Sequence, residues 1–339
     1  MLKPSCGACR TGWNPRFHGP DFTLRVVAAL SLTGQNSHMT DQFAADKAAR
    51  ELAGKEGGFP TQEQAPPGLT TDMNPVPDHG EESWIGRGRL EGMKALITGG
   101  DSGIGRAVAI AYAREGADVA INYLAEEESD AQDTKQWIEK AGRKAVLLPA
   151  DLRDEQTARG VVDEAAAQLG GLDVVVNNAG FQWARREGGL QGLKTEEMDR
   201  VFKTNLYALF WVSQQALKYL GDGSSIINVS SIQAYDPSEN LIDYASTKAA
   251  INNFTVNLAN EIGEKGIRVN AVAPGPIWTP LQPATKAGES MPAFGGDTAL
   301  GRAGQPSELA GAFVFLASPA EASYVSGTVI GVTGGKPVF

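Results

Sequence analysis

Cysteine and histidine are scarce in this chain of 339 residues, which has two Cys and three His. Both cysteines, Cys6 and Cys9, lie near the N-terminus, so no disulfide framework supports the fold and a reducing, cytoplasmic compartment is expected. Their C-x-x-C spacing also occurs in zinc and redox sites, but no second Cys pair follows. We therefore expect no metal site.

Basic residues and long apolar runs are also in short supply. The chain carries 30 Lys and Arg against 40 Asp and Glu, a net charge of −10, which disfavours nucleic acid as a partner. Apolar runs such as 174–176 and 313–316 are far shorter than the roughly 20 residues of a membrane-spanning helix, so no membrane partner is expected. The hydrophobic fraction of 42% and the charged fraction of 21% are those of a globular protein.

The first 89 residues are rich in Gly, Pro, Asp and Thr and lack the periodicity of helices or strands. We expect residues 1–38 to be a disordered or non-native leader, since Met39 opens a polar, Ala-rich stretch typical of an N-terminus. Residues 39–89 are expected to form an arm, extended by its prolines from about Pro66 to Gly88. This piece has too few apolar side chains for a core but enough to dock on a neighbouring surface. Disorder in solution is the alternative.

Residues 90–339 are expected to form one domain, because short apolar runs alternate there with longer amphipathic runs. This pattern predicts an α/β fold with a doubly wound parallel sheet of about seven strands and helices on both faces. The expected strands are Lys94–Thr98, Asp118–Asn122, Ala145–Ala150, Asp173–Asn177, Ser225–Val229, Arg268–Ala273 and Thr328–Val332. The expected helices are Ile104–Glu115, Glu126–Ala141, Glu155–Leu169, Thr195–Leu220, Tyr244–Gly263 and Pro306–Ala317, with Asp154 and Ser307 as capping residues.

A glycine-rich turn joins the first expected strand to the helix that follows it. The turn reads Thr98-Gly99-Gly100-Asp101-Ser102-Gly103-Ile104-Gly105. Glycines let a backbone approach a pyrophosphate closely, and a helix N-terminus supplies free N–H groups and partial positive charge. A tight turn also needs glycine for structural reasons alone. Placed between strand and helix, the turn favours a Rossmann-type, dinucleotide-binding sheet.

Tyr244 and Lys248 are four residues apart and therefore lie on one face of the helix that they open. A phenol has an ordinary pKa of about 10, and a neighbouring ammonium group favours its ionised form. The pair is thus suited to proton transfer, although packing of the ring beside a solvated lysine is the alternative. Ser230 and Ser231 end the fifth expected strand, where a hydroxyl can hold a substrate oxygen or satisfy backbone groups.

Taken in order, these motifs resemble those of short-chain dehydrogenases/reductases (SDRs) over about residues 89–335. The resemblance rests on the T-G-x-x-x-G-x-G turn, the N-N-A-G string at 177–180, the Ser-Tyr-Lys set and the P-G segment at 274–275. It implies an NAD(P)-dependent oxidoreductase that interconverts an aldehyde or ketone and an alcohol by hydride transfer (EC 1.1.1.-). A dinucleotide-sensing regulatory protein without turnover is the alternative.

The resemblance also implies roles for individual residues. Tyr244 is expected to be the general acid/base, Lys248 to tune it and Asn205 to belong to a water relay that leads to the lysine. The spacing to Tyr244 favours Ser231 over Ser230 as the catalytic serine. The implied cofactor-binding residues are Gly99, Asp101, Ser102, Gly103, Ile104, Gly105, Asn122, Tyr123, Asp151, Leu152, Asn178, Ala179, Gly180, Tyr244, Lys248, Pro274, Gly275, Ile277 and Thr279.

The choice of cofactor depends on the end of the second strand, where NAD-selective members carry an acidic residue for the ribose hydroxyls. This chain has Asn122-Tyr123-Leu124 there, so one source of repulsion against a 2′-phosphate is absent. Asp101-Ser102, however, occupy positions where many NADP enzymes have Arg or Lys. We therefore expect NADP(H) to be favoured and NAD(H) to be possible, with Glu126–Glu128 forming the exposed start of a helix.

The long N-terminal extension resembles that of a bacterial branch with general-stress-type reductases, aldehyde reductases and glucose/ribitol dehydrogenases. The family implies a homotetramer built on the helices Thr195–Leu220 and Tyr244–Gly263, so the arm is expected to lie on its own domain and reach an adjacent subunit. The expected partner is a small carbonyl or alcohol substrate beneath the segments Gln233–Asp243 and Leu281–Leu300. Four aromatic side chains are expected either to line its pocket or to pack ordinarily: Phe181, Trp183, Trp278 and Phe294.

Overall fold

A seven-stranded parallel sheet organises the computed structural model, which describes residues 58–339. The strand order is β3-β2-β1-β4-β5-β6-β7, so the direction of the chain across the sheet reverses between β1 and β4. Ligands of doubly wound sheets bind at the carboxyl ends of the strands beside such a reversal. The predicted fold is therefore confirmed. The strands are β1 (Lys94–Thr98), β2 (Asp118–Tyr123), β3 (Ala145–Pro149), β4 (Val174–Asn177), β5 (Ser225–Val229), β6 (Arg268–Pro274) and β7 (Val329–Val332).

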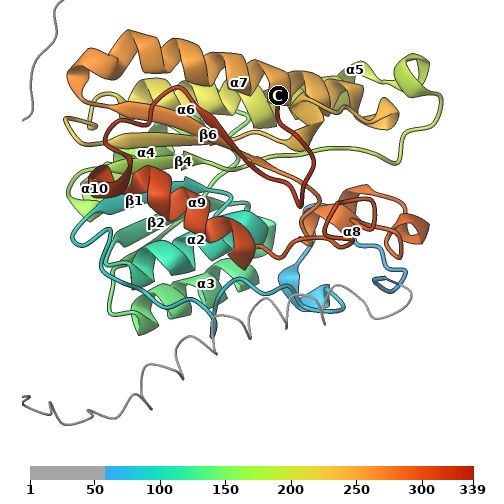
Figure 1. Ribbon diagram of the computed structural model, residues 1–339, viewed down its shortest axis with the longest axis horizontal. Helices are drawn as coiled ribbons and strands as arrows, with labels where there is room; N and C mark the ends of the chain where they lie inside the picture. Colours follow the sequence, from blue (N-terminus) through green and yellow to red (C-terminus); the bar gives the residue numbers. More distant parts are fainter. Residues whose placement is uncertain (1–57) are drawn as a thin grey trace, which may run out of the picture. The chain divides into compact units, whose positions relative to one another are not determined.

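Helices cover both faces of this sheet (Figure 1). One face packs against α2 (Gly103–Arg114), α3 (Glu128–Lys140) and α9 (Ser307–Ala317). The other face packs against α4 (Glu155–Leu169), α6 (Ala208–Ala216) and α7 (Ile242–Ile262). The shorter helices are α5 (Thr195–Phe202), α8 (Leu281–Thr285) and α10 (Pro319–Ala322). None of the helices within residues 58–339 is long and apolar enough to cross a membrane.

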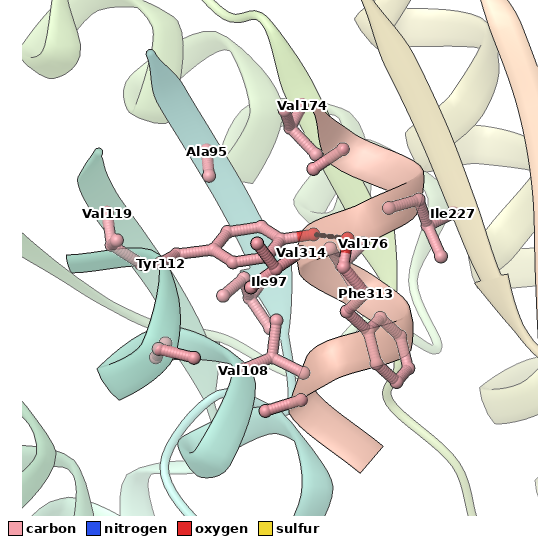
Figure 2. Packing of buried hydrophobic residues seen from close by; sticks show 14 of the residues in the cluster. Ala95, Ile97, Val108, Tyr112, Val119, Val174, Val176, Ile227, Phe313 and Val314 are labelled. Atoms are coloured by element: carbon pink, nitrogen blue, oxygen red, sulfur yellow. Dashed lines mark hydrogen bonds between the residues drawn. The ribbon is translucent and has the colours of Figure 1, made fainter. Parts of the chain in front are cut away.

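The core beneath α2 and α9 holds the glycine turn in place at the end of β1. Tyr112 of α2 is fully buried among valine, isoleucine and phenylalanine side chains, and its hydroxyl donates a hydrogen bond to the Phe313 carbonyl (3.1 Å) on α9 (Figure 2). A buried phenol is stable only when its hydroxyl has a partner. This bond ties the two helices together, so the N-terminus of α2 has a defined position.

The predicted helix Thr195–Leu220 is present, but it contains one π-helical turn and ends four residues earlier. The structure has α5, then a π-helical turn at Lys203–Tyr207, then α6, which ends at Ala216. A π-turn places one extra residue in a helical turn and is frequent at functional sites. Asn205 lies in this turn, and its side chain bonds to a neighbouring loop instead of facing solvent.

The two predicted capping residues have different outcomes. The Asp154 carboxylate accepts a hydrogen bond from the Thr157 N–H (2.8 Å) at the start of α4, as expected of a cap. Ser307 is the first residue of α9 and does not cap it. Its hydroxyl donates instead to the Asp78 carboxylate (2.8 Å), a residue of the arm.

Residues 58–90 pack on the same domain in an extended path. The ring of Phe59 stacks on Trp278 with centroids 3.7 Å apart and planes 2° apart. Farther along, the Thr70 N–H donates to the Asp130 carboxylate on α3 (2.7 Å). At the end of the path, Arg114 of α2 donates to the Trp84 carbonyl (2.6 Å). The expected leader, residues 1–38, and the arm up to residue 57 lie outside the described residues. Contact with an adjacent subunit stays a prediction.

Candidate active site

A cavity of about 240 Å³ lies at the carboxyl ends of the strands that flank the reversal. Its lining comes from the glycine turn after β1, the ends of β2, β4, β5 and β6, the start of α7, and α8. Every predicted site residue lines this cavity except Gly105 and Asn205. The sequence therefore predicted which side chains the fold brings together.

The glycine turn adopts backbone conformations that other residues rarely take. Gly99 has φ +60° and Gly103 has φ +51°. A Cβ atom on Gly105 would lie 1.9 Å from the Gly99 carbonyl oxygen, so a side chain there is excluded. Ser102 precedes α2 and its side chain makes no capping bond, so the first N–H groups of α2 lack a side-chain acceptor. A phosphate oxygen fits such a helix start.

Tyr244 lies in the first turn of α7 with its side chain almost buried. Burial raises the pKa of its phenol to about 12, and a hydrogen bond with the Ser231 side chain acts in the opposite direction. Ser230 points elsewhere, since its hydroxyl donates to the Lys248 carbonyl (3.2 Å). The structure thus places Ser231, the serine favoured by the spacing, against the phenol.

Lys248 follows Tyr244 by one turn of α7 and is buried. Its Nζ donates to the Val229 carbonyl (2.8 Å) and lies 5.4 Å from the centre of the Tyr244 ring. Burial lowers the pKa of the lysine to about 7. The ammonium group therefore stands where it can act on the phenol, but desolvation opposes its charge.

Asn205 does not line the main cavity but lies behind it. Its amide Nδ2 donates to the Phe181 carbonyl (2.9 Å) and to the Thr247 hydroxyl (3.1 Å), and its Oδ1 accepts from the Phe181 N–H (2.7 Å). The side chain therefore connects the π-turn to the segment after β4 and to the helix that carries Tyr244. Its place in a water relay stays a prediction.

Asn178 fixes the end of β4 against the glycine turn. Its Nδ2 donates to the carbonyls of Thr98 (2.9 Å) and Gly99 (2.7 Å). In return, the Thr98 hydroxyl accepts from the N–H groups of Asn178 and Ala179, each at 3.0 Å. These bonds hold the two strand ends on either side of the reversal at a set separation.

Comparisons with known proteins agree with this geometry. A family model described as "Enoyl-(Acyl carrier protein) reductase" matches residues 99–336. The protein named "Uncharacterized oxidoreductase YghA" from Escherichia coli K12 is 56% identical over 281 residues, 83% of this chain and 95% of that protein. A short chain dehydrogenase from Burkholderia cenocepacia J2315, solved in complex with NADP, is 37% identical with a TM-score of 0.68 and covers 73% of this chain and 99% of that one. The chain belongs to the short-chain dehydrogenase/reductase family.

The expected branch of the SDR family is confirmed as well. General stress protein 39 of Bacillus subtilis is 48% identical over 279 residues, which are 82% of this chain and 96% of that protein. This SDR is thus an oxidoreductase with relatives of the bacterial stress-protein type. The match covers nearly the whole of each relative.

The sequence missed one carboxyl group on the cavity. Glu127 was expected on the exposed start of a helix, but it is half-buried and lines the cavity, whereas Glu126 and Glu128 are exposed. It turns inward because its carboxylate accepts from the Leu124 N–H (3.0 Å), in the manner of a capping box. The Leu124-x-x-Glu127 spacing could have indicated this. Burial, with Asp101 as a like-charged neighbour, raises the pKa of Glu127 to about 8.

Two further groups on the cavity were not foreseen. Pro66 and Pro67 of the arm line it, so the arm is part of the site. Asp151, predicted as a cofactor contact, lines the cavity but also pairs with the Arg153 guanidinium, whose Nε lies 2.9 Å from the carboxylate. This ion pair lowers the pKa of Asp151. Arg153, two residues after Asp151 in the sequence, was the signal from which this ion pair could have been predicted.

Of the two alternatives for the four aromatic side chains, ordinary packing holds for Trp278 and Phe294, and cavity lining for Phe181. Phe181 lines the cavity, but Trp278 is fully buried between Phe59 and Phe294 and belongs to a separate apolar cluster, and Trp183 does not line the cavity. From the segment 281–300, the side chains of Leu281, Gln282 and Thr285 line the cavity. From the loop 233–243, none does.

Proposed function

We propose that this SDR is an NADP(H)-dependent enzyme that reduces an aldehyde or ketone to an alcohol, and that it runs the reverse oxidation at high pH. The observation that carries the proposal is that Ser231, Tyr244 and Lys248 line the same cavity as the open N-terminus of α2. A proton donor and a phosphate site share one cavity. That combination fits hydride transfer from a bound dinucleotide.

The residues of the cavity fit the cofactor in size and chemistry. The glycine turn leaves the backbone of α2 free for a pyrophosphate, and Pro274, Gly275, Ile277 and Thr279 stand beside Tyr244 and Lys248 for the nicotinamide end. A bound reduced nicotinamide supplies the hydride. The SDR of Burkholderia cenocepacia was solved with NADP, which supports NADP(H) as the cofactor, with NAD(H) as a second one.

Tyr244 is suited to donate the proton that the carbonyl oxygen needs. Burial keeps its pKa near 12, so the phenol is protonated at neutral pH and can give its proton as negative charge develops on the substrate oxygen. Ser231 holds that oxygen through its hydroxyl. Lys248 helps to return the phenol to its protonated form after the transfer. Asn205 positions the segment after β4, which lies beneath the phenol.

The test is a panel of aldehydes, ketones, diketones, sugars, polyols and one enoyl thioester, assayed with NADPH and NADH. We expect turnover of at least one carbonyl compound and loss of about a hundredfold or more in kcat for Tyr244→Phe, with cofactor affinity kept. Tyr219→Phe, on an exposed tyrosine, is the matched control and should keep full activity.

Three results would contradict the proposal. Full activity of Tyr244→Phe would remove the tyrosine from the chemistry. Tight cofactor binding without turnover of any carbonyl would favour the sensing function. Turnover of the enoyl thioester alone would move the reaction to a carbon–carbon double bond. The proposal includes a cytoplasmic location, which fits the scarcity of cysteine.

A further inference from the structure

Two acidic residues from different elements belong to the lining of the cavity. Asp101 lies in the glycine turn and Glu127 just before α3, and both line the cavity together with the end of β2, Asn122 to Leu124. In doubly wound folds, an acidic residue about 20 positions after the glycine turn meets the adenosine ribose of the cofactor. That residue ends the second strand, where this chain has Asn122 to Leu124, and Glu127 lies three residues farther on. The pair therefore lies beside the place that the ribose of a bound dinucleotide would take.

Asp101 has an oxygen without a partner. The residue is 1% exposed, and its Oδ2 makes no hydrogen bond within the structure. A buried carboxylate oxygen without a partner is costly unless a ligand or a proton satisfies it. The turn itself is held firmly, because the Asp101 carbonyl accepts from the Thr134 hydroxyl (2.8 Å). The unpartnered oxygen is thus a built feature of the cavity.

The surroundings of the pair are more acidic than basic. The nearby charged and titratable groups are Tyr123 on β2, Arg106 on α2, and Glu126 and Asp130 at the start of α3. The Arg106 guanidinium is shared with two other carboxylates, Glu81 of the arm (2.8 Å) and Asp133.

One arm contact moderates this acidity. Asp130 accepts from the Thr70 N–H (2.7 Å), which partly offsets its charge. A doubly charged 2′-phosphate would therefore meet net negative charge here when the acids are ionised.

We propose that Asp101 and Glu127 decide between a hydroxyl and a phosphate at the 2′ position of the cofactor ribose. When ionised, the two carboxylates accept hydrogen bonds from the 2′-hydroxyl of NAD(H) and repel the phosphate of NADP(H). When the pair holds a proton, the acid donates a hydrogen bond to the phosphate and the repulsion is reduced. This inference rests on the proposed function, because it assumes that a dinucleotide occupies the cavity.

The titration of the pair makes the preference depend on pH. Burial raises the pKa of Asp101 to about 7 and that of Glu127 to about 8, so a proton is held at neutral pH and lost as the pH rises. NADP(H) is then favoured near and below neutral pH, and NAD(H) gains as the pH rises toward 9. Binding of NADPH takes up a proton at pH 8, whereas binding of NADH does not.

The test measures the dissociation constants of NADPH and NADH by fluorescence titration at pH 6.5, 8 and 9. Above pH 6.5 the 2′-phosphate is mostly dianionic, so its own titration contributes little. We expect the ratio of the NADPH constant to the NADH constant to rise at least about tenfold from pH 6.5 to 9. In Glu127→Gln, which keeps an oxygen for the Leu124 N–H, the rise of the ratio with pH should be clearly smaller, because only Asp101 still titrates, and NADPH should bind more tightly at pH 9.

Glu126→Gln is the matched control, because it removes the same charge from an exposed neighbour at the same helix start. It should follow the wild-type pH dependence. A constant ratio in the wild type, or an unchanged pH dependence in Glu127→Gln, overturns this inference while leaving the proposed function intact. Failure of both cofactors to bind at every pH overturns the inference and the proposed function together.

Discussion

The side-chain amide of Asn205 is paired in both directions with the backbone of Phe181: Nδ2 donates to the carbonyl (2.9 Å) and Oδ1 accepts from the N–H (2.7 Å). The Asn205 amide thus forms the pair of hydrogen bonds that a neighbouring strand would form with Phe181. It reaches the Phe181 backbone only if its helical turn places the side chain close enough. The π-turn at Lys203–Tyr207 does this. The loop after β4 is thereby held under Tyr244.

Asn205→Ala should therefore reduce both stability and turnover. It leaves the N–H and carbonyl of Phe181 without their partner, a loss of about 1–3 kcal/mol in the free energy of unfolding. We expect kcat to fall more than KM rises, because the loop supports the tyrosine helix. Chemical denaturation and initial rates measure the two effects. Asn257→Ala, on the exposed face of α7, is the control and should change neither; equal effects in both variants would contradict the assignment.

The two adjacent serines should differ in their effect on catalysis. Ser231→Ala removes the hydroxyl that lines the cavity beside Tyr244 and should lower kcat by about one to two orders of magnitude. Ser230→Ala removes only a bond to the Lys248 carbonyl and should have a smaller effect on kcat. Steady-state kinetics of both variants decides this, and the reverse order would mean that Ser230 holds the substrate oxygen.

Reduction and oxidation should depend differently on pH. Since burial raises the pKa of the Tyr244 phenol to about 12, its acid form persists through neutral pH and reduction keeps its proton donor. Oxidation needs the phenolate, whose fraction grows about tenfold per pH unit below the pKa. We expect kcat/KM for oxidation of an alcohol to rise steadily between pH 7 and 10. A plateau below pH 8 would show that the bound cofactor and Lys248 lower the pKa of the phenol strongly.

The aromatic stack between the arm and the domain should contribute to stability. Phe59 is 1% exposed and Trp278 is 0% exposed, so Phe59→Ala would leave a cavity against the indole. We expect a loss of about 3–5 kcal/mol in the free energy of unfolding, together with weaker cofactor binding, because the arm lines the cavity. Val76→Ala, at an arm residue that is 53% exposed, is the control. Equal melting temperatures for the two variants would mean that the arm is not docked in solution.

The homotetramer implied by the family can be tested on the helices named for it. Several large apolar side chains on these helices are exposed in the single chain, among them Tyr207, Phe210 and Val256. Burial of such groups stabilises subunit contacts, so Phe210→Asp should yield smaller species in sizing chromatography. Tyr324→Asp, a fully exposed residue outside these helices, should leave the elution volume unchanged. A monomeric wild-type protein would show that the tetramer prediction is wrong.

The sheet and most of the cavity could be predicted because their signals are local. Each strand is a short apolar run, and the residues of the site follow strands or open helices, as Gly99 and Tyr244 do. The π-turn could not be predicted, since Asn205 makes its bonds to Phe181, which is distant in the sequence. Helix propensity reflects only residues that are close in the sequence, so it does not report such a distant contact.

The surroundings of individual side chains could not be predicted from the sequence either. Glu126, Glu127 and Glu128 are identical in type and adjacent, yet only Glu127 turns toward the cavity. Trp278 follows a strand, as a pocket residue would, but Phe59 of the arm covers it. In both cases the deciding contact comes from the folded geometry and not from composition.

The arm also has a consequence for the order of events during synthesis. Some of its partners come late in the chain: the Pro75 carbonyl accepts from Trp278, 203 residues on, and Asp78 accepts from Ser307, 229 residues on. At ribosomal speeds of about 5–20 residues per second, the arm waits on the order of ten to forty-five seconds for this part of its docking surface. The cavity that Pro66 and Pro67 help to line is therefore completed only when nearly the whole chain has been made, so cofactor loading belongs to the finished protein and not to the nascent chain.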